Sequence, residues 1–263
     1  MGLIAGAPAT LCRLRREVAK IEGQQTDLDA GIRRLALGVP AIDLRLQGGL
    51  AAARLHEIAP PAARDAGAVI GFALALATRA QGGRQRHTLW IQTDHAAGEA
   101  GNLYGPGCDL FGLPAPHLLI LKVPRPIDAL WAMEEALKSR ALASVVAELP
   151  ADAPLADLTA TRRLTVAARE GEGFALLLRH RPSLLTSSAE TRWEVAALPG
   201  KPDRFGGLGR TAFVLSLVKN RCGPTGRFVV AWDHHDRIFS ALPLGLAAAI
   251  AGRPDRAQRI RAG

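Results

Sequence analysis

The chain has 263 residues, 48% of them hydrophobic, with a formal net charge of +9 and an isoelectric point of about 10.4. A chain of this length and composition can bury a substantial core, and no stretch of it resembles a disordered linker. No run of ~18 apolar residues occurs, so we expect no membrane span. Cys12, Cys108 and Cys222 are widely spaced and fit no metal-binding pattern. These features favour a globular protein of the reducing cytoplasm.

Arginine dominates the basic residues. Of 33 lysines and arginines only five are lysines, which leaves 28 arginines. A basic surface attracts polyanions, and arginine suits phosphate recognition better than lysine. GC-rich codons also enrich arginine together with alanine, glycine and proline. The composition therefore fits both a DNA partner and a codon bias.

An amphipathic helix is predicted for residues 10–22, before a polar connector that ends near residue 36. Its apolar residues Leu11, Leu14, Val18 and Ile21 follow a 3-4-3 spacing that forms one narrow seam. This seam fits two interpretations equally well, packing on the chain's own core and binding to a partner protein.

Residues 37–80 are the stretch around which the chain is organised. A turn-rich approach ends at Gly48 and Gly49, and a short apolar run covers residues 55–58. An irregular segment, 59–66, then precedes an apolar stretch, 67–80, that is long enough for three to four helical turns. Strand, loop and helix in this order form the phosphate-binding unit of P-loop proteins.

The loop of this unit lacks phosphate-binding chemistry. Pro60 and Pro61 have no N–H group, and Asp65 adds a negative charge where phosphates would lie. Ala66 and Gly67 occupy the places of the lysine and the hydroxyl residue that hold phosphate and Mg²⁺. We therefore expect a degenerate nucleotide pocket, no cofactor and no enzymatic activity.

Strands and helices alternate through the following residues, which predicts an α/β fold with a largely parallel sheet covered on both faces. Strands are expected at 88–92, 117–123, 143–148 and 174–178, and helices at 127–139 and 158–169. The closing strands, from residue 193 onward, predict an antiparallel extension. Residues 244–263 are expected to form a short apolar helix and a basic tail.

Two carboxylates lie at the ends of predicted strands. Asp94 follows the strand at 88–92 and suits a helix N-cap, and Glu148 ends the strand at 143–148. Adjacent His234 and His235 lie in a hairpin turn, where neighbouring side chains diverge and no third ligand is spaced suitably. We expect no metal site.

Two groups of basic residues are candidate contacts. Arg179, Arg181 and Arg192 surround the end of the strand at 174–178 and could meet DNA phosphates. Lys219, Asn220 and Arg221 end the apolar run 213–218. This second group fits a protein or DNA contact and, equally, a basic strand end in solvent.

The order of these motifs resembles the core of the recombinase RecA over roughly residues 38–240. In RecA a Leu-Asp pair, a Gly-Gly-Leu turn and an Arg-x-x-Glu-Ile strand lead into the P-loop. The matching residues are Ile42-Asp43, Gly48-Gly49-Leu50 and Arg54-Leu55-His56-Glu57-Ile58. A RecA-like chain of this size without its P-loop is similar to the ImuA family, accessory proteins of bacterial mutagenesis cassettes. The cell-division inhibitor SulA is a second relative of that kind.

The resemblance implies a RecA-like core at 37–243 between an N-terminal helix and connector (1–36) and the C-terminal tail (244–263). Asp94 matches the place of the RecA catalytic glutamate, and Glu148 matches the Walker-B aspartate. Arg179, Arg181 and Arg192 lie where RecA has its DNA-binding loop, which is about twice as long there. The N-terminal seam and the run from Lys219 to Arg221 match surfaces that join neighbouring RecA protomers.

The function implied is that of a non-catalytic adaptor in SOS-induced translesion synthesis and mutagenesis. The expected partners are an ImuB-type inactive polymerase relative, an error-prone DNA polymerase, RecA and single-stranded DNA. A SulA-like division inhibitor and an ATP-dependent recombinase-type enzyme are the alternatives.

Overall fold

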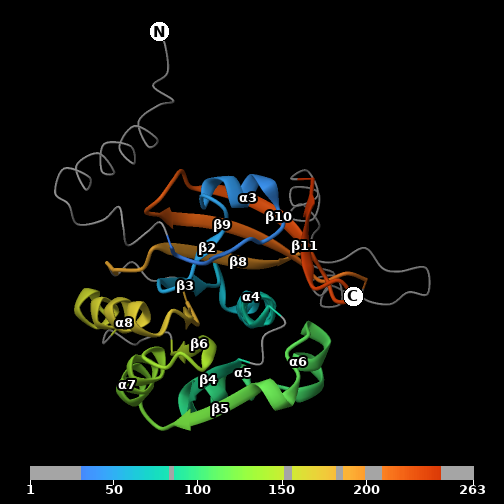
Figure 1. The fold of residues 1–263 in the computed structure, drawn as a ribbon. Helices are drawn as coiled ribbons and strands as arrows, with labels where there is room; N and C mark the ends of the chain where they lie inside the picture. Colours follow the sequence, from blue (N-terminus) through green and yellow to red (C-terminus); the bar gives the residue numbers. More distant parts are fainter. Residues whose placement is uncertain (1–30, 83–85, 151–155, 182–185, 199–208, 244–263) are drawn as a thin grey trace, which may run out of the picture.

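The computed structural model describes residues 31–82, 86–150, 156–181, 186–198 and 209–243 (Figure 1). The strands are β1 (Arg34–Leu35), β2 (Leu50–Ala51), β3 (Leu55–Ala59), β4 (His87–Thr93), β5 (Leu118–Val123), β6 (Leu142–Leu149), β7 (Phe174–Arg179), β8 (Thr191–Leu198), β9 (Ala212–Asn220), β10 (Gly226–Asp233) and β11 (Ile238–Leu242). The α-helices are α3 (Pro40–Arg45), α4 (Ala66–Gln81), α5 (Asp94–Ala100), α6 (Gly105–Phe111), α7 (Pro126–Leu137) and α8 (Leu158–Gly171), and short 3-10 turns cover Ala63–Asp65 and Ala115–His117. The predicted N-terminal helix and the C-terminal helix and tail lie outside the described residues.

Nine strands form one sheet in the order β11-β10-β9-β8-β3-β7-β6-β4-β5. The six strands from β8 to β5 run parallel, and β9, β10 and β11 continue the sheet as antiparallel neighbours. The predicted α/β class, the mostly parallel sheet and the antiparallel extension are therefore confirmed. The extension starts one strand later than expected, because β8 itself is parallel to β3.

Helices cover both faces of the parallel part (Figure 1). Alternate residues of β7 face opposite sides, as a strand requires. Leu176 and Leu178 join the core cluster that contains α4, whereas Ala175 and Leu177 join the cluster that contains α7 and α8. Burial on both faces explains why the central strands read as unbroken apolar runs. No helix among the described residues is both long and apolar enough to cross a membrane.

The approach to β3 is held by the residues that carry the RecA resemblance. Asp43 accepts hydrogen bonds from the backbone N–H groups of Leu37 (2.7 Å) and Gly38 (2.9 Å). Gly49 has φ = +131°, and a Cβ at this position would lie 2.3 Å from the carbonyl oxygen of Leu35. Only glycine fits this close approach. The approach also pairs β1 with β2, although β1 precedes residue 37, where we expected the core to begin.

Helix α6 forms in a stretch for which the sequence analysis expected no helix. Pro106 lies in its first turn, where a missing N–H costs no hydrogen bond, and Gly112 ends it in a left-handed conformation. Burial of Cys108 and Leu113 fastens this short helix to the core that contains α4. Tertiary packing overrides the weak helix propensity of its glycines and proline.

Candidate functional site

The connection between β3 and α4 forms a short turn that is hydrogen-bonded to a neighbouring strand of the sheet. A 3-10 turn covers Ala63–Asp65, and α4 begins directly at Ala66. Asp65 is 6% exposed, and its carboxylate accepts a hydrogen bond from the backbone N–H of Ala197 in β8 (3.0 Å). Pro60, in the same loop, is buried. The loop that would cradle phosphates in a P-loop protein is here tied to β8.

Asp94 does not cap α5. The N-cap is Thr93, whose hydroxyl oxygen accepts the backbone N–H of Ala96 (3.1 Å), and Asp94 is the exposed first residue of the helix. The predicted N-cap role of Asp94 is wrong because the preceding threonine already occupies that position.

Glu148 is the penultimate residue of β6, and its side chain is completely buried. Its Oε1 accepts hydrogen bonds from the indole N–H of Trp90 and from Nε2 of Gln92 (3.2 Å). Its Oε2 lies 3.5 Å from Nε2 of His180, whose Nδ1 is 3.9 Å from a carboxylate oxygen of Glu99. The carboxylate at the Walker-B place is thus held by protein side chains on one oxygen and only loosely approached on the other.

A cavity of about 530 Å³ lies between α4, the α5–α6 segment and the strands β8 and β9. Its walls are mostly apolar; they include Ile70, Gly71, Leu74, Phe111 and Phe213. The buried Cys108 thiol also lines it, and burial raises the pKa of this thiol. Of the six residues predicted for the degenerate pocket, the cavity brings together Gly67 and Glu148, while Pro60, Asp65, Ala66 and Asp94 lie outside its lining.

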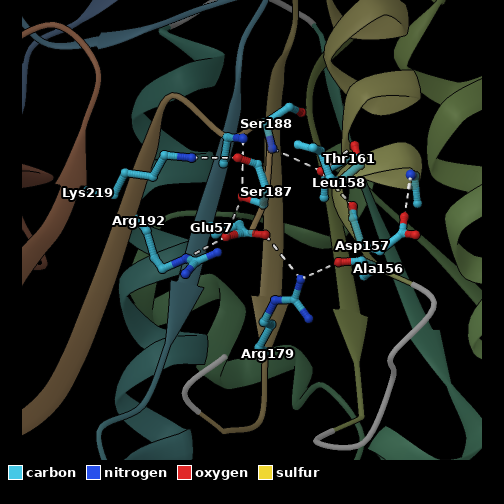
Figure 2. A network of polar contacts seen from close by, with 12 residues as sticks. Glu57, Ala156, Asp157, Leu158, Thr161, Arg179, Ser187, Ser188, Arg192 and Lys219 are labelled. Atoms are coloured by element: carbon cyan, nitrogen blue, oxygen red, sulfur yellow. Dashed lines mark hydrogen bonds and ion pairs between the residues drawn. The ribbon is translucent and has the colours of Figure 1, made fainter. Parts of the chain in front are cut away.

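On the other face of the sheet, Glu57 is the centre of a buried ion-pair network (Figure 2). The carboxylate is 1% exposed. Its Oε1 accepts Nη2 of Arg179 (3.2 Å), and its Oε2 accepts Nε of Arg192 (2.7 Å) and the hydroxyl of Ser187 (3.0 Å). Arg179 also donates to the carbonyl oxygen of Ala156 (2.8 Å). Cations from β7 and β8 therefore converge on one carboxylate of β3.

This network changes the interpretation of the three candidate DNA-contacting arginines. The side chain of Arg179 is 5% exposed and that of Arg192 is 17% exposed, and both point toward Glu57. Arg181 is exposed. Arg179 and Arg192 are thus engaged inside the protein, which leaves Arg181 as the surface residue of the three.

The run from Lys219 to Arg221 also divides into inner and outer residues. Lys219 donates to the carbonyl oxygen of Ser187 (2.6 Å), and burial, followed by the charges of Arg221 and Arg192, lowers its pKa. Asn220 donates its amide to the carbonyl oxygen of Arg45 (3.0 Å) and so fixes the end of α3. Arg221 is exposed. Two of the three predicted contact residues therefore stabilise the local fold.

Comparison with known proteins identifies relatives. The chain is 30% identical over 251 residues to Protein ImuA of two Caulobacter vibrioides strains, a match that covers 86% of this chain and 99% of each relative. The chain belongs to the ImuA family. No protein-family model matches it. The resemblance to ImuA inferred from the sequence is therefore confirmed.

Several polar residues that organise these sites in this ImuA-family chain were not singled out from its sequence. They are Trp90, Gln92, His180 and Ser187, together with the role of Glu57 as a charge centre. One signal was available: Glu57 interrupts an apolar strand, and a buried carboxylate requires partners. The identity of those partners depends on strand order, which the sequence does not show.

Proposed function

We propose that this ImuA-family protein is a non-catalytic accessory protein of SOS-induced mutagenesis and translesion synthesis, acting in the cytoplasm through protein contacts. Family membership supports a role in damage-inducible mutagenesis. The proposal that the protein is not an enzyme rests on the connection between β3 and α4, where a 3-10 turn and the hydrogen bond from Ala197 to Asp65 take the place of a phosphate-binding loop.

Nucleotide hydrolysis would need groups that this connection lacks. A P-loop supplies successive backbone N–H donors, a lysine for the β- and γ-phosphates and a hydroxyl for Mg²⁺. Here Pro60 and Pro61 supply no donors, and Asp65 holds the loop against Ala197. Glu148, at the Walker-B place, is bonded to neighbouring side chains instead. These features support a chain that does not hydrolyse ATP.

Support for protein contacts comes from the edge of the sheet at β5. Among the described strands β5 pairs with β4 alone, so its outer backbone groups face away from the sheet. Leu119 and Leu121 of β5 are 49% and 38% exposed, beside Ile127 and Trp131 of α7, which are 46% and 64% exposed. We call these four residues the apolar edge surface.

Natural proteins normally protect such an edge with charges, proline, a bulge or a covering segment. In β5 the sole charged residue is Lys122. An extended partner segment could pair with the β5 backbone and bury the apolar edge surface, which is a common mode of peptide recognition. We assign this surface to the ImuB-type polymerase relative, with an error-prone DNA polymerase and RecA as further members of the assembly.

Single-stranded DNA is the remaining proposed partner. The exposed arginines Arg181 and Arg221 could contact its phosphates, and the net charge of +9 would favour the encounter.

The test has two parts. Purified protein should neither hydrolyse ATP nor bind Mg-ATP in calorimetry, with or without single-stranded DNA. Leu121→Lys and Trp131→Glu should abolish co-purification of the ImuB-type protein, whereas Leu44→Lys should not, because Leu44 is an 82% exposed leucine on the distant helix α3. ATP turnover would refute the non-catalytic proposal. Retention of the ImuB-type protein by both edge variants would refute the assignment of the surface.

A further inference from the structure

We propose that the protein segment bound at β5 is an extended strand in which apolar and acidic side chains alternate. This inference rests on the proposed function, because it takes the apolar edge surface to be a contact with another protein. It adds the side-chain chemistry that the bound segment must carry.

The two faces of β5 differ in chemistry. Leu119 and Leu121 pair with β4 residues that pack in the core cluster containing α7, so they lie on the face that α7 covers. Ile120 pairs with Trp90, which belongs to the cluster containing α4, and Lys122 shares this second face because it is two residues further along the strand. A strand added beside β5 would therefore meet leucines on one face, and an isoleucine and a lysine on the other.

The α7 face selects apolar side chains in the bound strand. Ile127 and Trp131 are four residues apart, which places them on one side of α7, and they are 46% and 64% exposed. Every second side chain of an added strand points toward this face, beside Leu119 and Leu121. Large apolar side chains at those positions would remove the apolar edge surface from water, which is the main favourable contribution to such an association.

The opposite face selects an acidic side chain. Lys122 is exposed, and its ammonium donates to Asn102 Oδ1 (2.8 Å), which is an uncharged acceptor. Among the described residues, no carboxylate forms an ion pair with Lys122. A strand laid along β5 would remove part of this ammonium from water, and a buried charge is costly unless it is paired. A carboxylate at an intervening position of the bound strand supplies that pair.

A second copy of this chain fits the same edge less well. The sequence of β5 is Leu-Leu-Ile-Leu-Lys-Val, which contains no acidic residue. Pairing of two β5 strands would cover both lysines without a countercharge, and lysine on an edge strand commonly prevents such self-pairing. Charge complementarity therefore favours a different protein as the occupant.

Variants of Lys122 test the acidic requirement in the complex with the ImuB-type protein. Lys122→Glu should weaken binding by about tenfold or more, because like charges would then face each other. Lys122→Arg keeps the charge and should retain binding. Arg169→Glu is the matched control, since Arg169 is an exposed cation on α8, and this reversal should leave the affinity measured by calorimetry unchanged.

A synthetic peptide tests the same chemistry without depending on the identity of the partner. The probe alternates leucine and aspartate over the length of one strand, and the control has the same composition with the two residue types in separate blocks. The probe should slow hydrogen exchange at alternate backbone amides of β5, because successive residues of a strand face opposite neighbours. The control should bind at least about tenfold more weakly, because its side chains cannot match both faces of β5.

The outcomes separate this inference from the proposed function. Loss of the ImuB-type protein in Leu121→Lys together with full binding by Lys122→Glu would overturn the inference and leave the proposed function intact. If neither edge variant affects the ImuB-type protein, that assignment fails, and the peptide pair alone decides the inference. Equal binding of the two peptides, or binding without protection of β5 amides, would overturn it. A dimer of the free protein that Leu121→Lys dissociates would assign the edge to a second copy and would also overturn it.

Discussion

Glu57 and Glu148 are two buried glutamates on strands separated by β7, yet their environments differ. Glu57 is 1% exposed, and both of its carboxylate oxygens accept donors, two of them from arginines. Glu148 is 0% exposed, and one of its oxygens accepts two donors while the other accepts none among the described residues. Glu57 lies on the face of the sheet that α8 covers, and Glu148 is a buried residue beside the cavity next to α4.

The difference is that the protein hydrogen-bonds both carboxylate oxygens of Glu57 but only one carboxylate oxygen of Glu148. A buried charge costs little only when it is paired and its oxygens are hydrogen-bonded. Glu57 meets this condition through residues of the same chain, so it fixes β3, β7 and β8 relative to one another. Glu148 meets this condition at Oε1, whereas the nearest ion-pair partner of its Oε2 is His180 Nε2, 3.5 Å away.

The largest effect is expected when the Glu57 centre is removed. Glu57→Gln removes the buried charge that Arg179 and Arg192 both contact and should lower the free energy of unfolding by about 3–5 kcal/mol. Urea denaturation measures this loss. Glu170→Gln is the matched control because Glu170 is exposed on α8, and it should change stability by less than about 0.5 kcal/mol. A small loss for Glu57→Gln would show that the network is not structural.

A pair of arginines gives the next largest contrast. Arg179→Met leaves Glu57 with fewer donors and should cost about 2–3 kcal/mol, whereas Arg181→Met should stay within about 0.5 kcal/mol because Arg181 is exposed. If the chain binds single-stranded DNA, Arg181→Met should also reduce the slope of log affinity against log salt by ~0.7. If folded Arg179→Met also showed a reduced slope of log affinity against log salt, Arg179 would have to contact DNA.

Glu148→Gln should have a much smaller effect on stability, within about 1 kcal/mol. The glutamine retains an acceptor for Trp90 and Gln92. Urea denaturation beside Glu57→Gln makes the comparison direct. A loss as large as that of Glu57→Gln would mean that the Glu148 charge is fully compensated in the folded protein.

The sequence predicts the frame of the fold better than its sites. Unbroken apolar runs located β4, β6 and β7 to within one residue, because both faces of central parallel strands are buried. It also placed Glu148 at the end of a core strand. The inward direction of Arg179 could not be predicted, because its partner Glu57 is 122 residues away and meets it only through the pairing of β3 with β7.

The cavity was likewise beyond sequence reasoning. One wall is α6, a helix that its glycines and proline made hard to predict. Another wall is the start of β9, and its neighbour β8 is parallel to β3, which the sequence did not indicate. Local propensity does not carry such information, since the cavity exists only where segments distant in sequence pack against one another.

The smallest effect concerns Lys219, the third cation near Glu57. Burial lowers its pKa, and the charges of Arg221 and Arg192 lower it further, while the charge of Glu57 raises it. The unfolded chain therefore binds this proton more tightly than the folded chain, and the free energy of unfolding rises with pH as the pH passes from the folded pKa to the ordinary lysine value of ~10.4. In Lys219→Met this rise should be absent, so the unfolding free energies of the two proteins should diverge across that alkaline interval. NMR titration of the Lys219 side chain should give a lowered pKa, and Glu57→Gln should lower it again because the one attractive charge is lost. A Lys219 pKa that does not respond to Glu57→Gln would separate this lysine from the network and restore it as a candidate for an external contact.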